Sequence, residues 1–433
     1  MSQTINIFWF RRDLRLNDNR GLWHALSSGL PVIPLFIFDK NILQSLPGDD
    51  RRVNFIYKTL SSMNRKLLQN GSGLHVYFGT PPEVFENLLQ KYRVNAVFTN
   101  HDDEPYALER DAKIREMLST AGVSFHTFGD HLLFERSDVL KPDGSPYVVF
   151  TPYSKKWLEL KARKGIPSYP SETLTGYFSD QTAPSFPALE EMGFRFLDFD
   201  YPPDEPDTLK LKNYAGTRNF PALDATSRLG LHLRFGTVST RECIRTAEAV
   251  STTWLNELIW REFFAQIMYH FPYVVNGAFR KEYDRIEWLN REEDFVRWCE
   301  GTTGFPMVDA GMRELKQTGF MHNRVRMVTA SFLTKHLLID WRWGEAWFAE
   351  NLLDFELASN NGNWQWAAGS GCDAAPYFRI FNPAEQARKF DKDEVYIRKW
   401  IPEYGTSTYP RPMVNHSEAR ERCLKTYARA LKP

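Results

Sequence analysis

Trp254-Leu-Asn-Glu-Leu-Ile-Trp-Arg-Glu-Phe263 tells most about this chain, together with Asn360-Asn-Gly-Asn-Trp-Gln-Trp366. On a helix, Trp254, Glu257 and Arg261 share one face, and Trp260 lies near its edge. A core helix rarely buries a carboxylate and a guanidinium among large aromatic residues without partners for both. A pocket that stacks a flat ring system and hydrogen-bonds its edges needs this mixture. The alternative is a core helix whose Glu257 and Arg261 reach solvent.

The composition allows several kinds of partner and argues against metal and disulfide scaffolds. At 433 residues the chain is long enough for two or three domains with large cores. Lys plus Arg and Asp plus Glu both number 54, which does not favour a nucleic-acid partner, although a balanced total can hide a local basic patch. The cysteines form no CxxC pair, so we expect neither a disulfide scaffold nor a zinc site.

The sequence lacks the pattern of a membrane or secreted protein. The apolar run Ile5–Phe10 is followed at once by Arg11-Arg12-Asp13, so it is too short for a signal peptide. No stretch approaches the ~18 to 20 apolar residues of a membrane span. We therefore expect a cytoplasmic protein with no membrane partner.

The N-terminal part, residues 1–130, alternates strand and helix patterns. Amphipathic helical stretches separate short β-rich runs, which predicts an α/β domain with a doubly wound parallel sheet and any ligand at the carboxyl ends of the strands. The predicted strands are Ile5–Phe10, Val32–Phe38, Leu74–Phe78, Ala96–Thr99 and Ser124–Phe128, and the predicted helices include Arg51–Gln69, Pro82–Tyr92 and Tyr106–Ala121. Neither a dinucleotide glycine fingerprint nor a phosphate-cradling GxxxxGK motif follows the first strand.

The rest of the chain changes character twice. Residues 131–206 are predicted to connect two domains, because prolines interrupt any regular element over much of this stretch. Residues 207–433 are predicted to form an all-α domain. The segment Ser239–Glu242 matches a capping box that opens a helix. Asp340-Trp341-Arg342-Trp343-Gly344 is predicted to end another helix, with its glycine in the stop position.

Two polar motifs of the helical part are candidates for ligand contacts. Hydroxyls in Thr226-Ser-Arg-Leu229 can hydrogen-bond a phosphate, and ordinary helix capping is the alternative. In Phe320-Met-His-Asn-Arg-Val-Arg-Met327, Asn323 and Met327 share a helix face with Arg326 beside it, whereas Arg324 points elsewhere. The alternative for this motif is a helix with a solvated basic face.

Other motifs are ambiguous. Trp364 and Trp366 diverge by roughly 200° on a helix, so each would face a different environment. Trp288 and Trp341 are isolated indoles for which structural packing is the simplest interpretation. His101-Asp-Asp-Glu104 follows a predicted strand and resembles a metal site, but we expect it to cap the next helix and predict no metal.

These motifs together carry a family resemblance. WLNELIWREF, TSRL, MHNRVRM, NNGNWQW, DAAPYFRIFNP and the opening FWFRRDLRLNDN resemble the photolyase/cryptochrome family over residues 5 to about 400, most closely the class I cyclobutane pyrimidine dimer photolyases. The resemblance implies a photolyase/cryptochrome fold and a carbon–carbon lyase that repairs pyrimidine dimers in DNA with blue or near-UV light. It also implies one non-covalent FAD, active as FADH−, in the helical domain.

The resemblance assigns the FAD contacts residue by residue. It places near the phosphates Tyr214, Thr226, Ser227, Arg228 and Leu229. It places around the flavin and adenine Trp254, Glu257, Arg261, Asn323, Arg326, Asp354, Glu356 and Asn360. Asn360 matches the position near the flavin N5, where asparagine is typical of repair enzymes. Phe320 and Glu356 depart from the usual Trp and Asp, which puts fine adenine or ribose contacts in question.

The resemblance also assigns substrate and electron-transfer roles. Trp260 and Trp366 match the indoles that clamp the extruded dimer, and Glu257, Asn323 and Met327 match residues that line its pocket. Trp364, Trp341 and Trp288, in that order outward, match the chain that reduces the flavin with light. Arg218, Arg324 and Arg379 match the arginines that face DNA. The implied partner is UV-damaged DNA, bound by a monomer.

The antenna chromophore is not assigned by the sequence. Glu109 matches one folate-contacting acid, but Leu108 replaces its polar neighbour, and Val274-Val-Asn276 lacks the lysine that some folate-binding members use. Methenyltetrahydrofolate, a deazaflavin, another flavin or no antenna all stay open.

Other functions stay open as well. A cryptochrome photoreceptor would share the fold and FAD without repair, but many cryptochromes alter the residues that match the dimer pocket. A (6-4) photoproduct enzyme would need paired histidines near Asn323, where only His322 is present. A flavin-free DNA-binding protein would not need the full set of FAD-matching residues.

Overall fold

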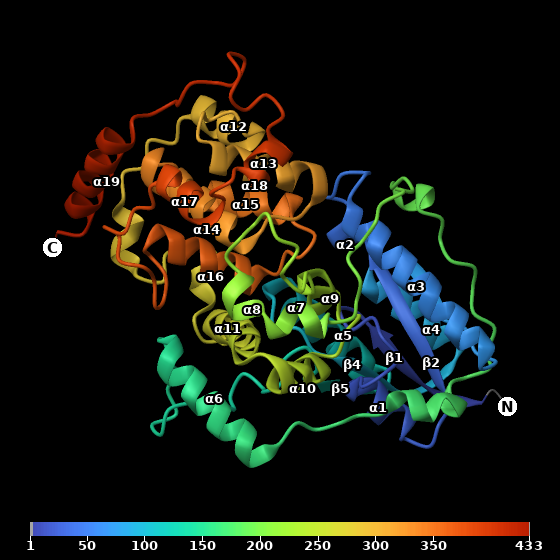
Figure 1. Cartoon of the computed structure of the whole chain (residues 1–433). Helices are drawn as coiled ribbons and strands as arrows, with labels where there is room; N and C mark the ends of the chain where they lie inside the picture. The colour runs from blue at the N-terminus through green and yellow to red at the C-terminus, as the bar shows by residue number, and fades with distance from the viewer. Residues whose placement is uncertain (1–2, 433) are drawn as a thin grey trace. The chain divides into compact units, whose positions relative to one another are not determined.

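Five apolar runs of the N-terminal third form a parallel sheet in the computed structural model, which describes residues 3–432. The strand order is β3-β2-β1-β4-β5, and all neighbouring strands run parallel (Figure 1). The strands are β1 (Thr4–Phe10), β2 (Val32–Asp39), β3 (His75–Gly79), β4 (Arg93–Asn100) and β5 (Ser124–Phe128). This confirms the predicted parallel sheet and all five predicted strands.

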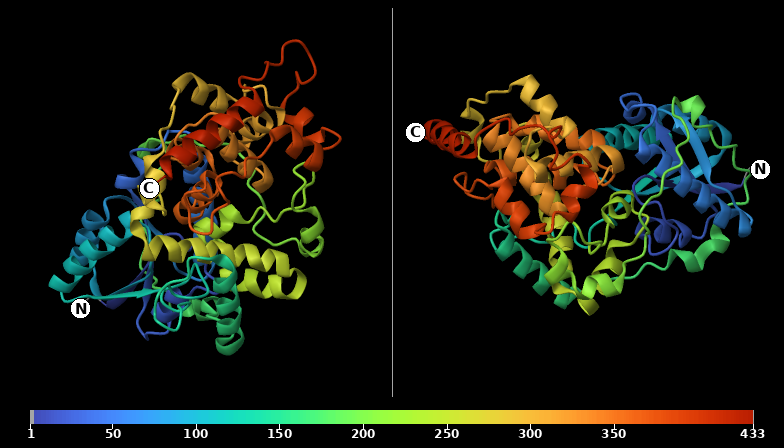
Figure 2. Two further views of the ribbon diagram at one scale, coloured as in Figure 1. Left: turned by 90° about the vertical axis from the view of Figure 1, so that its left-hand side faces the viewer. Right: turned by 45° about the horizontal axis from the view of Figure 1, so that its top comes forward.

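Helices cover both faces of this sheet (Figure 2), in keeping with strands that are apolar on both sides. Helices α1 and α3 share a core cluster with Phe8 and Phe36, whereas α4 and α5 share a second cluster with Ile7 and Ile33. The helices of this first unit are α1 (Arg20–Leu26), α2 (Lys40–Leu43), α3 (Arg51–Gln69), α4 (Pro81–Lys91), α5 (Pro105–Thr120), α9 (Gly230–Phe235) and α10 (Thr240–Val250), whose last turn lies outside it. The predicted helices of residues 51–121 are confirmed to within one residue at each end.

Distant segments of the chain complete this unit. It joins the residues up to Glu135 with Lys164–Pro206 and Arg228–Thr246. The long connector contributes two short 3₁₀ segments, Ser171–Tyr177 and Glu190–Met192, the first of them interrupted at Leu174, and otherwise irregular backbone. Ser239 caps α10 as predicted, because its hydroxyl accepts a hydrogen bond from the Glu242 backbone N–H at 3.3 Å.

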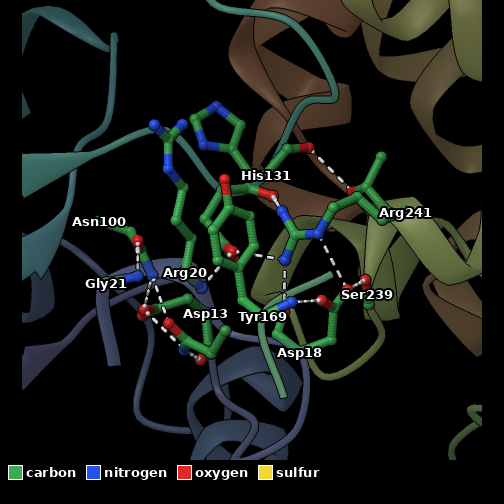
Figure 3. A network of polar contacts seen from close by, with 12 residues as sticks. Asp13, Asp18, Arg20, Gly21, Asn100, His131, Tyr169, Ser239 and Arg241 are labelled. Carbon is green, nitrogen blue, oxygen red and sulfur yellow. Dashed lines mark hydrogen bonds and ion pairs between the residues drawn. The ribbon is translucent and has the colours of Figure 1, made fainter. Parts of the chain in front are cut away.

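A buried network of charges fixes α10 to the sheet (Figure 3). The Arg241 guanidinium donates to Asp18 at 2.9 Å and to Asp130 at 2.8 Å, and Arg15 donates to Asp130 at 2.5 Å. The hydroxyl of Ser239 also contacts the Asp18 carboxylate. Burial alone would raise the pKa of Asp130, but the two guanidinium groups hold it well below its usual range.

The second unit is helical and contains Arg136–Arg163, Asp207–Ser227 and the residues from Ala247 onward. Its core is a cluster of apolar residues that includes Trp298, Met312, Phe332, Trp341 and Trp364. Its helices are α6 (Phe150–Lys164), α7 (Thr208–Lys212), α8 (Tyr214–Thr217), α11 (Thr252–His270), α12 (Glu292–Glu300), α13 (Pro306–Thr318), α14 (Asn323–Ser331), α15 (Trp341–Asn351), α16 (Leu357–Ala368), α17 (Pro383–Phe390), α18 (Val395–Trp400) and α19 (His416–Ala430), with 3₁₀ turns at Pro272–Val275 and Lys281–Arg285 and a π-helical turn at Phe332–His336.

The prediction that Asp340–Gly344 ends a helix is wrong, because this segment begins one. The Asp340 carboxylate accepts a hydrogen bond from the Arg342 backbone N–H at 3.0 Å and so caps α15. Gly344 lies inside α15, where a Cβ atom would overlap the ring of Trp364 on α16. The glycine is therefore present for close helix packing and not for a left-handed stop.

Helix α6 lies within the stretch for which we predicted a connector. Its buried residues Tyr153, Trp157 and Leu160 stand at helical spacing and form one apolar face. The helix belongs to the helical unit, apart from its last residue. Among the described residues, none of the helices is both long enough and apolar enough to cross a membrane.

Candidate functional site

A cavity opens in the helical unit. Its walls come from α14, the end of α15, the segment that follows it, and α16 (Figure 1). It is lined by Asn323, Arg326, Met327, Ala330, Phe348, Leu352, Asp354, Phe355, Glu356, Ser359, Asn360, Asn363, Trp364, Trp366 and Ala367. Three separate motifs of the sequence, MHNRVRM, the acidic segment around Asp354 and NNGNWQW, thus meet at one cavity.

Two arginine–carboxylate pairs stand at this cavity. Arg326 on α14 donates to both oxygens of Asp354, at 2.9 and 3.1 Å, and also to the Met321 carbonyl at 2.7 Å. Arg261 on α11 donates to both oxygens of Glu356, at 2.8 and 3.0 Å. Such bidentate pairs fix the orientation of both side chains and place hydrogen-bonding groups around an apolar space. Glu356, a departure from the usual family residue, therefore has a structural partner in Arg261.

Asn360 is held by a residue that the sequence did not single out. Its side-chain amide donates to the Glu345 carboxylate at 2.7 Å and to the Glu345 carbonyl at 3.0 Å. Burial raises the pKa of Glu345, and the hydrogen bond from Asn360 partly offsets this effect. Glu345 thus fixes which way the Asn360 amide points at the cavity. No motif marks Glu345, since it lies 15 residues away on α15.

Glu257 stands beside a cation and a phenol. Its carboxylate forms an ion pair with Arg218, and the Arg218 guanidinium lies 6.0 Å from the Tyr214 ring centroid. Burial raises the pKa of Glu257, and the Arg218 charge acts in the opposite direction. Burial and then the Glu257 carboxylate raise the pKa of Tyr214. Tyr214 on α8, which the resemblance assigns to the FAD phosphates, therefore lies close to Glu257 on α11, which it assigns to the dimer pocket.

The predicted DNA-facing arginines lie near one another in the helical unit. The pKa of Arg324 is lowered by burial and by the positive charges of Arg218 and Arg379. Arg324 donates to the Asn219 side chain at 2.7 Å and lies over the Phe390 ring at 4.3 Å, so it does point away from the cavity as predicted. We call Arg218, Arg324 and Arg379 the arginine cluster.

Lys335 supports this cluster from inside. It is buried in the π-helical turn, and its ammonium group donates to the Arg379 carbonyl at 2.9 Å. Burial and the Arg379 charge lower the pKa of Lys335 to about 8, although Cys423 acts the other way. A buried amine therefore holds the backbone at the exposed Arg379.

Trp254, Trp260 and the segment Thr226–Leu229 lie outside the lining of the cavity. Trp254 is buried on α11, whereas Trp260 on the same helix is half-buried. Thr226 and Ser227 belong to the helical unit, and Arg228 and Leu229 belong to the α/β unit. Arg228 has a left-handed backbone with φ of 53°. The predicted phosphate contact of this segment stays a prediction.

The aromatic residues around Trp364 include one that the sequence analysis missed. Trp364 and Trp341 are buried in the same core cluster, and the half-buried Trp288 packs against it. The Trp364 ring lies 5.0 Å from Phe348 and 6.1 Å from Trp298, between centroids. Trp298 carries no recognisable motif, so only the packing identifies it. Trp366 is half-exposed and Trp364 is buried, but both line this cavity, so the two indoles differ in exposure and do not face separate environments as predicted.

A second cavity lies in the α/β unit at the carboxyl ends of β1 and β2, where a ligand was expected. Trp9 forms its aromatic wall, and the guanidinium groups of Arg11 and Arg110 lie 5.2 and 4.9 Å from the Trp9 ring centroid. Tyr106 donates to Asp39 at 2.5 Å. Burial and the Asp39 carboxylate raise the pKa of Tyr106 to about 12.

The acidic residues near this second cavity have cationic partners. Asp102 pairs with Arg12 at 3.2 Å, and Glu104 pairs with Arg234 at 2.7 Å. Glu104 stands at the N-cap position of α5, but its side chain makes no cap hydrogen bond, so the predicted capping holds in position only. Glu109 lies on the exposed side of α5, where it pairs with Lys113 at 2.6 Å.

Comparison with known proteins identifies the family. Residues 6–171 match the model of the DNA photolyase domain, and residues 254–407 match the model of the FAD binding domain of DNA photolyase. A deoxyribodipyrimidine photo-lyase of Synechococcus is 37% identical over 98% of this chain and 96% of its own length. The chain belongs to the photolyase/cryptochrome family. A deoxyribodipyrimidine photo-lyase of Alkalihalophilus pseudofirmus is 36% identical over 98% of both chains.

Solved photolyase and cryptochrome structures share the whole fold. A bacterial class III photolyase from Agrobacterium tumefaciens has a TM-score of 0.86 at 33% identity and covers 100% of this chain and 99% of its own. An archaeal photolyase from Sulfolobus tokodaii with two FAD molecules has a TM-score of 0.81 at 33% identity, over 98% of this chain and 99% of its own. A Synechocystis cryptochrome has a TM-score of 0.83 at 26% identity, over 98% and 99%.

The photolyase-type cavity of the helical unit fits FAD, which this domain binds. Its apolar wall, from Phe348, Phe355 and Trp364, suits the faces of a ring system, whereas Arg326 offers a donor and the Asn360 side-chain oxygen an acceptor to its polar edges. Both side chains are already oriented by acidic partners, Asp354 and Glu345. A cavity with pre-oriented polar groups and aromatic residues in its lining matches a flavin better than a purely apolar ligand.

Proposed function

We propose that this protein repairs cyclobutane pyrimidine dimers in DNA by light-driven cleavage of the carbon–carbon bonds that join the two bases. The observation that carries this proposal is the cavity of the helical unit, whose polar and aromatic lining continues to Asn323, Met327 and Trp366 at its open side. The relatives named deoxyribodipyrimidine photo-lyase support the same reaction.

The cofactor provides the electron chemistry, and the protein provides position and charge. Bound FAD in its fully reduced form, FADH−, would supply on illumination the electron that opens the cyclobutane ring and would take an electron back after cleavage. Arg326, Asp354, Arg261 and Glu356 would hold this group, and Asn360, whose N–H groups are both used on Glu345, would offer it the side-chain oxygen. We propose Trp254, Tyr214 and the segment Thr226–Leu229 as further FAD contacts, in accordance with the family match.

A dimer must leave the duplex to be reached, and aromatic faces stabilise such extruded bases. We propose that Trp260 and Trp366 stack the dimer and that Asn323 and Met327 contact it. Glu257 would hydrogen-bond one base edge. Its ion pair with Arg218 supports this role, because both side chains are more than a third exposed and the carboxylate can exchange this partner for substrate. The arginine cluster would bind the phosphates beside the lesion.

We further propose that Trp364, Trp341 and Trp288 pass electrons inward from the protein surface when the bound flavin is oxidised. Their shared core cluster supports this route. In Trp364→Phe, light-driven reduction of oxidised flavin should nearly stop, because phenylalanine keeps the packing but is much harder to oxidise. Repair by chemically pre-reduced protein should continue. Photoreduction of Trp364→Phe at the wild-type rate would contradict this route.

The alternative function is a cryptochrome photoreceptor without repair, which the similarity to the Synechocystis cryptochrome keeps open. The test is to illuminate UV-damaged thymine oligomers with blue light in the presence of chemically reduced protein, with a dark sample as control. Loss of dimers in the light alone would support repair. A protein that carries FAD but leaves the dimers intact would favour the photoreceptor.

The second cavity is our proposed site for an antenna chromophore. Its aromatic wall with guanidinium groups suits a flat ring system, and the Sulfolobus tokodaii relative with two FAD molecules implies a light-harvesting role for the second one. We expect a flavin or deazaflavin added to the protein to bind there. Trp9→Ala should weaken this binding, and Glu109→Ala should not, since Glu109 pairs with Lys113 on the exposed side of α5.

We propose that the protein acts as a monomer in the cytoplasm, as a class I enzyme, and that the helical unit forms its catalytic domain. The cavity is lined by residues of a single chain, so one chain is sufficient to bind one lesion, which supports a monomer. Light scattering of the purified protein, with and without dimer-containing DNA, would test this state: a mass of about twice the 50.5 kDa chain without DNA would contradict it.

A further inference from the structure

The indole of Trp260 is covered on one face by a phenylalanine from another helix. The ring centroids of Phe150 and Trp260 are 3.7 Å apart, and the ring planes differ by 3°. The rings therefore overlap face to face, unlike the edge-on contacts that dominate the nearby core, such as Trp260 with Phe263 at 84°. Both rings are half-buried, so this pair lies at the border between core and solvent.

Phe150 is fixed in place by the helix that it begins. On α6, Phe150 continues the face formed by Tyr153, Trp157 and Leu160, all of which are buried. The Trp157 indole donates to the buried Glu262 of α11 at 2.6 Å, which anchors α6 on the helix that carries Trp260. Phe150 is therefore the end of a docked face and not a free side chain.

A second contact joins the start of α6 to the segment that precedes Arg379. The Phe150 backbone N–H donates to the Asp373 carboxylate at 3.0 Å. Asp373 has a left-handed backbone, with φ of 47°, and begins the segment that leads to Arg379. The start of α6 is thus held from both sides, by α11 and by this segment.

We propose that Phe150 is a positioning residue for substrate: its ring holds the plane of the Trp260 indole, so that only the opposite face receives the extruded dimer. This inference rests on the proposed stacking role of Trp260. A ring in van der Waals contact over one indole face leaves no room there for a base. It also restricts rotation of the indole, so less order must be gained when the dimer binds.

The alternative is that Phe150 occupies the place of a base and must leave before the dimer can bind. The docked face of α6 argues against this, because moving Phe150 away would disturb Tyr153 and Trp157. The two cases predict opposite effects when the ring is removed. Loss of a support weakens dimer binding, whereas loss of an obstruction strengthens it.

The test compares dark binding of the holoprotein to dimer-containing and undamaged oligonucleotides at one salt concentration. Phe150→Leu keeps an apolar side chain without a flat face, and it should lower the preference for the dimer by roughly 2- to 13-fold, the usual value of an aromatic pair. Binding to undamaged DNA and FAD content should stay at wild-type levels. Phe150→Tyr keeps the ring and should restore the preference.

Leu160→Ala is the matched control, because Leu160 is buried on the same face of α6 but lies ten residues from Phe150. It should loosen α6 and keep the preference for dimers. An unchanged or increased preference in Phe150→Leu, while Trp260→Leu loses it, would overturn this inference alone. An equal loss in Leu160→Ala would overturn it too, since the effect would then come from helix docking. A wild-type protein with no preference, or a Trp260→Leu variant that keeps it, would overturn the proposed stacking function together with this inference.

Discussion

At the scale of single residues, acidic side chains orient the polar groups at the cavity of the helical unit. Arg326 is held by Asp354, Arg261 by Glu356, and Asn360 by Glu345. The family match identified five of these residues. It did not identify Glu345, because a partner acts through its position and carries no motif of its own. The same holds for Trp298 beside Trp364 and for Phe150 beside Trp260.

Arg326→Ala should lower the affinity for FAD by roughly 10- to 150-fold, because a hydrogen bond from a charged group contributes about 1.5–3 kcal/mol. The Asp354 carboxylate would also lose its bidentate partner. The measurement is FAD titration of the apoprotein. Arg313→Ala is the control, since Arg313 pairs with Glu403 at 2.7 Å, has a similar exposure to Arg326 and lies outside the cavity lining. Equal loss of affinity in both variants would contradict the assigned role of Arg326.

At the scale of helices and strands, the elements with a regular apolar pattern were predicted correctly. The prediction was wrong where the same residues can stand at the start or at the end of a helix. The five strands follow from apolar runs between turns, and the sheet needs them apolar on both faces. The segment Asp340–Gly344 contains a capping aspartate and a glycine, which fit either end of a helix. The hydrogen bond from the Arg342 backbone N–H to Asp340 and the ring of Trp364 against Gly344 decide between them, and the second contact joins residues of different helices. Helix α6 is absent from the prediction because the whole of residues 131–206 is assigned to a connector. The apolar face formed by Tyr153, Trp157 and Leu160 is therefore overlooked.

Gly344→Ala should destabilise the helical unit by about 1–3 kcal/mol, because the added methyl group would overlap the Trp364 ring in a packed core. Gly216→Ala in α8 is the matched control. No atom lies within 4 Å of a Cβ built at Gly216, so alanine there should be neutral or stabilising by up to about 1 kcal/mol. Equilibrium unfolding in urea measures both. Equal stabilities of the two variants would contradict the packing assigned to α15 and α16.

The buried Lys335 in the π-helical turn should make stability depend on pH. Its pKa is about 8 in the folded protein against an ordinary value of 10.5. Below pH 8 both states carry the charge, and the folded state bears the full cost of burying it. Between pH 8 and 10.5 the folded state loses its proton first, so stability rises with pH.

Relative to Lys335→Met, which cannot titrate, the unfolding free energy of the wild type should therefore rise by about 3 kcal/mol across this window. Unfolding curves at several pH values give the difference. A difference that stays constant from pH 8 to 10.5, or that falls, would show that Lys335 does not carry a buried charge in the folded state.

At the scale of the whole molecule, DNA binding cannot come from net charge, because the 54 basic and 54 acidic side chains balance. Binding must come from a local group of cations, and the arginine cluster is our candidate. The sequence supplied the three arginines through the family match. It could not show that the three lie near one another, because Arg218 is more than a hundred residues from both Arg324 and Arg379 in the sequence.

Arg379→Ala should lower the slope of the logarithm of DNA affinity against the logarithm of salt concentration by about 1, the effect of one lost phosphate contact. Arg388→Ala removes the same charge from α17, where Arg388 is exposed and pairs with Glu385. It should leave the slope unchanged. The measurement is the binding of undamaged duplex at several salt concentrations, and equal slopes for the two variants would argue against a specific phosphate contact at Arg379.

The central claim, that the helical unit binds an extruded pyrimidine dimer beside FAD and splits it in light, has one direct test. Chemically reduced wild-type protein is mixed with dimer-containing or undamaged DNA at one salt concentration, and affinity is measured in the dark before dimers are counted after blue light. The account predicts tighter dark binding to dimer-containing DNA and loss of dimers only after illumination. Equal affinity for both DNAs, with all dimers intact after light, would contradict it and point to a photoreceptor.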